Sequence, residues 1–117
     1  MKNQMFKHRM GFAINGIVAA IKRENSLKTQ VVFAVLAIVA LIVLQPALVW
    51  WALVILMIAL VLAAELLNTA LEGLCDYVQP EHHEAIGYIK DVAAGAVWLL
   101  SLAAAVIGSL MIYSVFA

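Results

Sequence analysis

The sequence predicts an all-α membrane protein, in which an N-terminal amphipathic helix is followed by three transmembrane helices. Composition is the first observation: the 117-residue chain is 67% hydrophobic and 12% charged, with a mean hydropathy of +1.07. Soluble domains are roughly 45–50% apolar and about 25% charged, so this chain belongs in a bilayer. The second observation is three long apolar runs. The third is that all but one of the basic residues precede the first of these runs.

Residues 1–28 form the predicted interfacial segment. Lys7, Asn15 and Lys22 lie on one side of this helix, off its apolar stripe. A helix that is basic on one side and apolar on the other suits the anionic cytoplasmic surface of a membrane. The alternative is that the helix packs on the transmembrane bundle. The apolar stripe, which recurs at helical spacing, consists of Phe6, Met10, Ala13, Ile14, Ile17 and Ile21.

The three apolar runs predict spans at residues 29–45, 47–66 and 92–115, because a span needs about 20 mostly apolar residues. Gln45-Pro46 separates the first two runs and indicates a tight hairpin. Basic residues before the first span place the N-terminus in the cytoplasm by the positive-inside rule. Residues 65–91 are then a cytoplasmic helix extension and loop. No repeat or linker divides the chain, so residues 1–117 are expected to form one domain.

The distribution of charge and cysteine excludes two further classes. The basic residues flank a membrane entry point and do not form a separate patch, so nucleic acid is not expected as a partner. The single Cys75 rules out an internal disulfide framework.

Polar side chains return abruptly where the second apolar run ends. At about 100° per residue, Asn68, Glu72 and Asp76 fall roughly 60°, 20° and 20° from the line through Glu65, so all four share one helix face. Clustered carboxylates repel one another unless a cation neutralises them. Oxygen ligands of this kind suit magnesium, which usually bridges protein carboxylates to a substrate phosphate. The alternative is a solvated helix extension whose acids only face water.

Within this stripe, Glu65 is closest to the lipid tails and is therefore best placed to accept a proton from a lipid hydroxyl. Lys90 could supply the positive charge that phosphoryl oxygens require. Common nucleotide-binding motifs such as G-x-x-x-x-G-K-[ST] and G-x-G-x-x-G are absent from the sequence. The spacing of His82 and His83 does not match a zinc site. Any nucleotide site must therefore be of an unusual kind.

A long pattern carries a family resemblance. It reads E-x-x-N-[ST]-A-[IL]-E-x-x-x-D from Glu65 to Asp76, followed by Glu81-His82-His83 and by Lys90-Asp91 with a small-residue stretch to Val97. Gly16 and the Glu24-x-x-Leu27-Lys28 stretch extend it toward the N-terminus. This pattern resembles the prokaryotic diacylglycerol kinase family, which includes the undecaprenol kinases.

The resemblance implies a bacterial inner (plasma) membrane homotrimer, whose active sites are shared between subunits and use ATP with Mg²⁺. It implies that Glu65 is the catalytic base, that Glu24 and Glu72 bind the metal, and that Asn68 and Lys28 lie with Glu65 at the lipid substrate. The nucleotide-binding residues that it implies are Glu24, Glu72, Glu81, His83, Lys90 and Asp91.

Two departures bear on the lipid acceptor. Family members of the diacylglycerol type often carry Phe-Arg-Gln-Glu where this chain has Leu27-Lys28-Thr29-Gln30, so an acid is missing at Gln30. The Asn68-Thr69 pair and residues 93–96 resemble the undecaprenol branch equally well. The expected reaction is phosphorylation of diacylglycerol to phosphatidic acid, with undecaprenol as the alternative acceptor. Non-enzymatic alternatives are a small membrane assembly subunit and a cation-conducting oligomer lined by Glu65 and Glu72.

Overall fold

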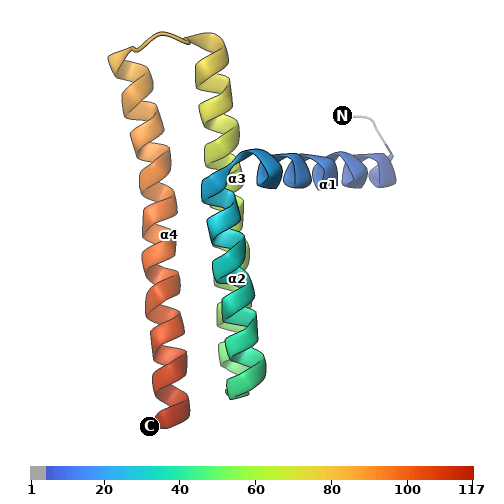
Figure 1. Cartoon of the computed structure of the whole chain (residues 1–117), viewed down its shortest axis with the longest axis vertical. Coiled ribbons are helices and arrows are strands. Elements are labelled where there is room, and N and C mark those ends of the chain that lie inside the picture. The colour runs from blue at the N-terminus through green and yellow to red at the C-terminus, as the bar shows by residue number, and fades with distance from the viewer. Residues whose placement is uncertain (1–4) are drawn as a thin grey trace.

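The computed structural model describes residues 5–117, so the first four residues of the predicted interfacial segment, including Lys2, lie outside the described residues. Within residues 5–117 the chain is all-helical and contains no strand, as predicted. Figure 1 shows the long helices running side by side and a shorter one projecting from them. The helices are α1 (Phe6–Arg23), α2 (Asn25–Leu44), α3 (Leu48–Val78) and α4 (Glu84–Phe116).

Helices α2, α3 and α4 are each long and apolar enough to cross a membrane, which agrees with the predicted number of spans. At 1.5 Å per residue, the 31 residues of α3 and the 33 of α4 extend about 46 Å and 50 Å. These lengths exceed the roughly 30 Å hydrocarbon core of a bilayer. Both helices therefore continue beyond the hydrocarbon, and a short loop joins them there.

Helix α4 begins at Glu84, ahead of the predicted start of the third span at residue 92. His83 precedes the helix, and its Nδ1 atom accepts a hydrogen bond of 3.1 Å from the backbone N–H of Ala85. The acidic side chain of Glu84 in the first turn is favourable at the positive end of the helix dipole. As a consequence, Lys90 and Asp91 lie inside a helix that continues without a break into the span.

The chain turns sharply between α1 and α2, and Figure 1 shows α1 projecting to the side of the long helices. Lys22 and Arg23 occupy the last turn of α1, where basic side chains complement the helix dipole. Glu24 then adopts an extended conformation, with φ −105° and ψ 116°. Lys28 consequently belongs to α2 and not to the segment before it. The location of α1 in a membrane interface stays a prediction.

The turn between α2 and α3 occurs at the Gln45-Pro46 pair. Gln45 ends α2 in the left-handed conformation with φ 46°, and its Nε2 atom donates a 2.9 Å hydrogen bond to the carbonyl of Ile42. A left-handed residue followed by Pro is a common way to end a helix, because Pro cannot continue it.

Helix α3 packs along both α2 and α4, whereas α2 and α4 make few direct contacts. The buried core is small and lies toward the α2–α3 turn, where Leu41, Val54 and Met111 from the three helices meet. Most other large apolar side chains are exposed, as expected for helices that face lipid. The weak direct packing of α2 against α4 leaves a groove between them, floored by α3.

Candidate functional site

Glu65 is the first polar residue of the stripe on α3, and its side chain is buried, with only 5% of the residue exposed. Its Oε2 atom accepts a 3.4 Å hydrogen bond from the hydroxyl of Ser26, in the first turn of α2. One turn earlier on α3, Val61 and Leu62 line the apolar groove. The Glu65 carboxylate therefore lies where the apolar groove ends and the polar stripe begins.

Asn68 and Glu72 form the next pair along the stripe. The Nδ2 atom of Asn68 donates a 3.3 Å hydrogen bond to Oε1 of Glu72. The Oδ1 atom of Asn68 is buried and has no hydrogen-bond partner among residues 5–117. A buried acceptor without a partner is costly, and a cation or a donor group on a ligand would satisfy it.

The metal site predicted at Glu24 and Glu72 can be compared with this geometry. In residues 5–117 of one chain, no three His, Cys, Asp or Glu side chains are grouped so that they could hold a metal ion. Magnesium is usually held by one or two carboxylates, with waters and substrate phosphates as its other ligands. The Glu72 carboxylate and the free Asn68 oxygen are hard donors of this kind, so the residues present fit that partial ligand set.

Asp76, the last member of the stripe, pairs with Lys90 of α4. The Lys90 Nζ atom lies 2.6 Å from Oδ1 of Asp76. This hydrogen bond raises the pKa of Lys90 above its ordinary value of 10.5, and nearby negative charge adds to the effect. Lys90 precedes the apolar part of α4, so its ammonium group lies beyond the hydrocarbon and stays charged at neutral pH.

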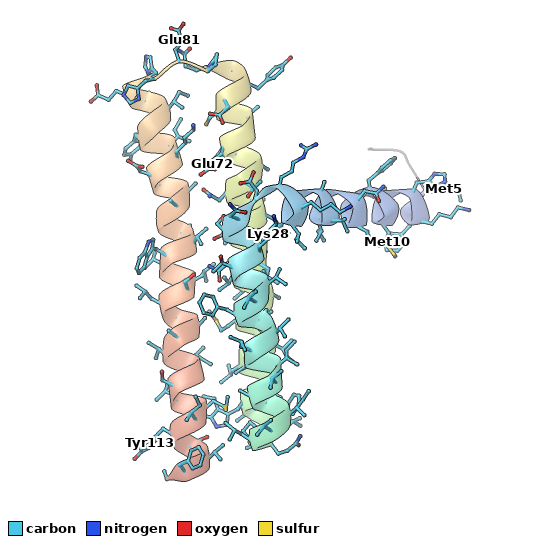
Figure 2. All side chains as sticks on the ribbon, viewed as in Figure 1. Met5, Met10, Lys28, Glu72, Glu81 and Tyr113 are labelled. Atoms are coloured by element: carbon cyan, nitrogen blue, oxygen red, sulfur yellow. The ribbon has the colours of Figure 1, made fainter. Side chains whose placement is uncertain are left out.

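Glu24 and Lys28 lie at the corner where α1 leaves the bundle. Glu24 is half-buried, and its carbonyl accepts a 3.1 Å hydrogen bond from the backbone N–H of Lys28. The side chain of Lys28 is exposed. Figure 2 shows Lys28 on α2 and Glu72 on α3, both near the level of this corner.

The remaining predicted nucleotide contacts lie further along the α3–α4 hairpin. Figure 2 shows Glu81 in the loop at the far end, well away from Glu72. Glu81, His83 and Asp91 are all exposed. His83 is engaged in capping α4. Among the described residues, no hydrogen bond joins these three side chains to Glu65 or Glu72 within the single chain.

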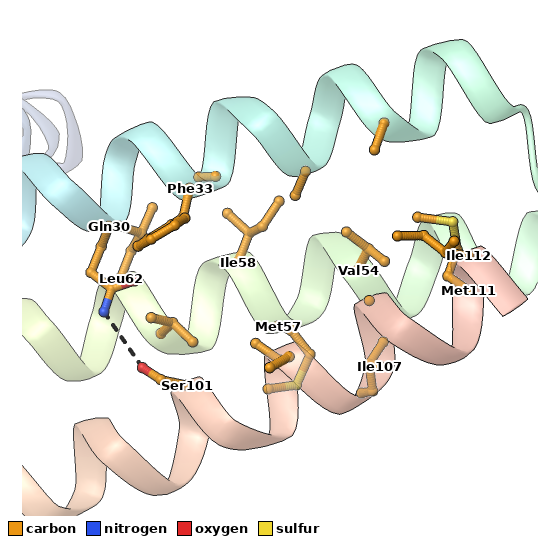
Figure 3. Close-up of a pocket in the computed structure, with 17 residues that line it drawn as sticks. Gln30, Phe33, Val54, Met57, Ile58, Leu62, Ser101, Ile107, Met111 and Ile112 are labelled. Carbon is orange, nitrogen blue, oxygen red and sulfur yellow. Dashed lines mark hydrogen bonds between the residues drawn. The ribbon is translucent and has the colours of Figure 1, made fainter.

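A groove of about 390 Å³ runs between α2, α3 and α4 (Figure 3). Its lining is aliphatic and aromatic except for Gln30 and Ser101, which lie at one end. The Nε2 atom of Gln30 is 3.4 Å from the hydroxyl oxygen of Ser101 and donates to it.

Sequence reasoning missed Ser26 and Ser101 as members of the site. Ser101 carries a weak signal, because it interrupts an apolar run, and polar groups inside a span are costly enough to need a reason. Ser26 carries none, because its contact with Glu65 joins positions 39 residues apart. Helical periodicity describes one helix and cannot reveal which side chains of two helices meet.

Comparison with known proteins identifies the family. Residues 11–112 match the model of a family described as prokaryotic diacylglycerol kinase. An undecaprenol kinase of Bacillus subtilis is 28% identical over 109 residues, covering 93% of this chain and 88% of the relative. A diacylglycerol kinase of Escherichia coli K12 is 29% identical over 106 residues, covering 91% and 87%. A diacylglycerol kinase of Synechocystis is 46% identical over 54 residues, covering 45% and 31%. The chain therefore belongs to the prokaryotic diacylglycerol kinase family and is a multi-pass membrane protein of the lipid kinase class.

Proposed function

We propose that this chain is an ATP- and Mg²⁺-dependent kinase that phosphorylates the free hydroxyl group of diacylglycerol and yields phosphatidic acid. The observation that carries the proposal is the buried carboxylate of Glu65 at the polar end of an apolar groove. A lipid whose hydrocarbon lies in the groove would present its polar head at that carboxylate. Membership in a lipid kinase family supports the reaction class.

In the proposed reaction, Glu65 accepts the proton of the lipid hydroxyl as general base. The lipid oxygen forms a bond to the γ-phosphorus of ATP, the bond from that phosphorus to the β–γ bridging oxygen breaks, and ADP leaves. Ser26 donates a long hydrogen bond of 3.4 Å to the Glu65 carboxylate and adds a weak restraint on its position. Phosphoryl transfer depends mainly on positioning and on electrostatic stabilisation, so a small site of this kind is sufficient.

The charged phosphates of ATP require positive charge near the reacting groups. A bound Mg²⁺ ion would neutralise phosphate oxygens, and Glu72, Asn68 and Glu24 are the residues that would hold it. Lys90 would contribute a further cation. Together with the metal-binding acids, Glu81, His83 and Asp91 complete the proposed nucleotide contacts. The Asn68–Glu72 pair supports this assignment, because it offers a carboxylate beside an unpartnered oxygen.

Undecaprenol is the second candidate acceptor. It is favoured by the similarity to the Bacillus subtilis relative named undecaprenol kinase, which extends over 93% of this chain. Both candidates share a single free hydroxyl group on a long hydrocarbon. They differ in what lies beside that hydroxyl, since diacylglycerol carries ester groups there and undecaprenol carries hydrocarbon alone.

We further propose a homotrimer in a bacterial inner membrane, with the N-terminus in the cytoplasm and with active sites shared between subunits. Basic residues before α2 support the orientation. Small residues at positions 93–96 support close helix approach, and within one chain no neighbouring helix lies within 4 Å of a β-carbon placed at Gly95. The wide separation of Glu81 from Glu72 within one chain is compatible with a neighbouring subunit completing each site.

A competition assay tests the proposed reaction. The purified full chain receives radiolabelled ATP, Mg²⁺, and diacylglycerol and undecaprenol together, and the labelled lipids are resolved. Phosphatidic acid is the expected main product. Undecaprenyl phosphate as the main product would support the second candidate. If neither lipid is labelled by protein of verified assembly, the kinase proposal is wrong, and the assembly-subunit and cation-channel alternatives gain support.

A further inference from the structure

The apolar groove has a defined orientation with respect to the proposed base. Gln30 on α2, Leu62 on α3 and Ser101 on α4 mark one end, and Met111 and Ile112 mark the other (Figure 3). Ser26 and Glu65 lie one turn beyond that first end, on α2 and α3 respectively. One turn advances a helix by about 5.4 Å. A lipid entering with its hydrocarbon in the groove would therefore pass Gln30 and Ser101 just before its head reaches Glu65.

The polar pair at this end is rich in hydrogen-bond donors. Gln30 uses one N–H bond toward Ser101, so its second amide N–H and the Ser101 hydroxyl proton remain available. The 3.4 Å distance between Gln30 Nε2 and Ser101 Oγ exceeds the usual 2.7–3.2 Å. Such a bond holds α2 to α4 only weakly. A better acceptor within the groove could engage either donor at little cost.

The two candidate lipids differ in whether they carry a hydrogen-bond acceptor for these donors. In diacylglycerol, ester carbonyl oxygens are separated from the free hydroxyl by the glycerol carbons, a distance of the order of one helical turn. In undecaprenol, hydrocarbon follows the hydroxyl directly and would leave the donors without a partner. Buried donors without partners are costly.

We propose that in this chain, where Gln30 stands in place of the acid often found in diacylglycerol-type members, Gln30 and Ser101 form a subsite that binds an ester carbonyl of the lipid and thereby selects diacylglycerol over a polyprenol. The inference rests on the proposed function, because it assigns the acceptor of the same Glu65 site. The occupant is the glycerolipid itself: the groove ends one helical turn from Glu65, at Leu62, and its polar lining residues Gln30 and Ser101 lie at that end.

The first test needs no mutation. It compares kcat/KM of the wild-type protein for diacylglycerol and for the ether-linked dialkylglycerol of the same chain lengths, at saturating ATP and Mg²⁺. The two lipids share the hydroxyl and the hydrocarbon and differ in the carbonyl oxygens. A preference of about tenfold for the diacyl lipid is expected from the loss of one or two buried hydrogen bonds. Equal values would overturn the proposal.

The second test uses Gln30→Met, which keeps the length of the side chain but removes the amide, and Ser101→Ala. Each is expected to reduce the diacyl preference from about tenfold to about two- to threefold. Ser109→Ala is the matched control in α4, because the Ser109 hydroxyl donates to the carbonyl of Ala105 in its own helix, at 2.8 Å. This control should keep the full preference.

The outcomes separate this inference from the proposed function. Equal activity on diacyl and dialkyl lipids, or activity on undecaprenol alone, would overturn the ester subsite and leave a lipid kinase. If the variants lower activity on diacyl and dialkyl lipids equally, Gln30 and Ser101 only hold α2 to α4, and the ester subsite is also overturned. Activity on none of these lipids would overturn both proposals. If a variant does not assemble, the wild-type comparison still decides.

Discussion

The ammonium group of Lys90 lies 2.6 Å from Oδ1 of Asp76, and this ion pair joins the loop-side ends of α4 and α3. Lys90 is the only lysine or arginine after α2. The same cation is thus both a structural partner of Asp76 and the proposed contact for ATP phosphates. An incoming phosphate group would compete with the Asp76 carboxylate for Lys90.

Substitutions at the two positions separate these roles. Lys90→Met is expected to raise KM for ATP about tenfold or more, because a hydrogen bond to a charged group is lost. Asp76→Asn leaves Lys90 charged and free, so KM for ATP should not rise. Steady-state kinetics at varied ATP provides the measurement. Both changes remove the ion pair, so equal effects would assign Lys90 a structural role alone.

The pH dependence of this ion pair has a definite sign. Pairing with Asp76 raises the pKa of Lys90 from 10.5, so its stabilisation is complete below that value and is lost as pH rises through the raised pKa. We therefore expect Asp76→Asn to change thermal stability equally at pH 7 and pH 8. If the effect of Asp76→Asn on thermal stability differs between pH 7 and pH 8, another group that titrates in this range contributes to it.

Glu65→Gln tests the general base, because Gln keeps the size of the side chain and its capacity to accept from Ser26 but cannot take up a proton. Turnover should fall by about 100-fold or more, within the ~10²–10⁴ range of acid–base catalysis. Glu84→Gln makes the same change at an exposed carboxylate and should leave turnover near wild type. Wild-type turnover by correctly assembled Glu65→Gln protein would remove Glu65 from this role.

Magnesium titrations test the metal ligands. Glu24→Gln and Glu72→Gln should each raise the Mg²⁺ concentration needed for half-maximal activity, because each removes one hard anionic ligand. The Glu84→Gln protein again serves as the control. If the titrations of both variants overlay that of the wild type, these acids are structural and the metal is bound elsewhere.

Subunit mixing tests the shared sites. Glu24→Gln subunits are combined with Glu72→Gln subunits at an Mg²⁺ concentration at which neither variant is active alone, under conditions in which exchange is verified. Part of the activity should return, because some shared sites would receive both intact acids. No recovered activity in mixed oligomers, or full activity of a detergent-solubilised monomer, would contradict the homotrimer with shared sites.

The sequence predicted the features that depend on one helix at a time. The count of spans follows from apolar length, and the common face of Glu65, Asn68 and Glu72 follows from the helical repeat. The contacts of Ser26 with Glu65 and of Gln30 with Ser101 were not predictable in this way. They depend on how far each helix is rotated and shifted against its neighbour, which the side chains of both helices decide together.

The continuous course of α4 from Glu84 to Phe116 has a mechanical consequence. At about 100° per residue, Lys90 and Ser101 fall within about 20° of each other on this helix, roughly 16 Å apart along its axis. An unbroken helix fixes the separation of these two positions. The proposed phosphate contact at Lys90 and the proposed lipid contact at Ser101 would therefore be held at a set distance on one face of α4, so that the helix itself would set the spacing between nucleotide and lipid.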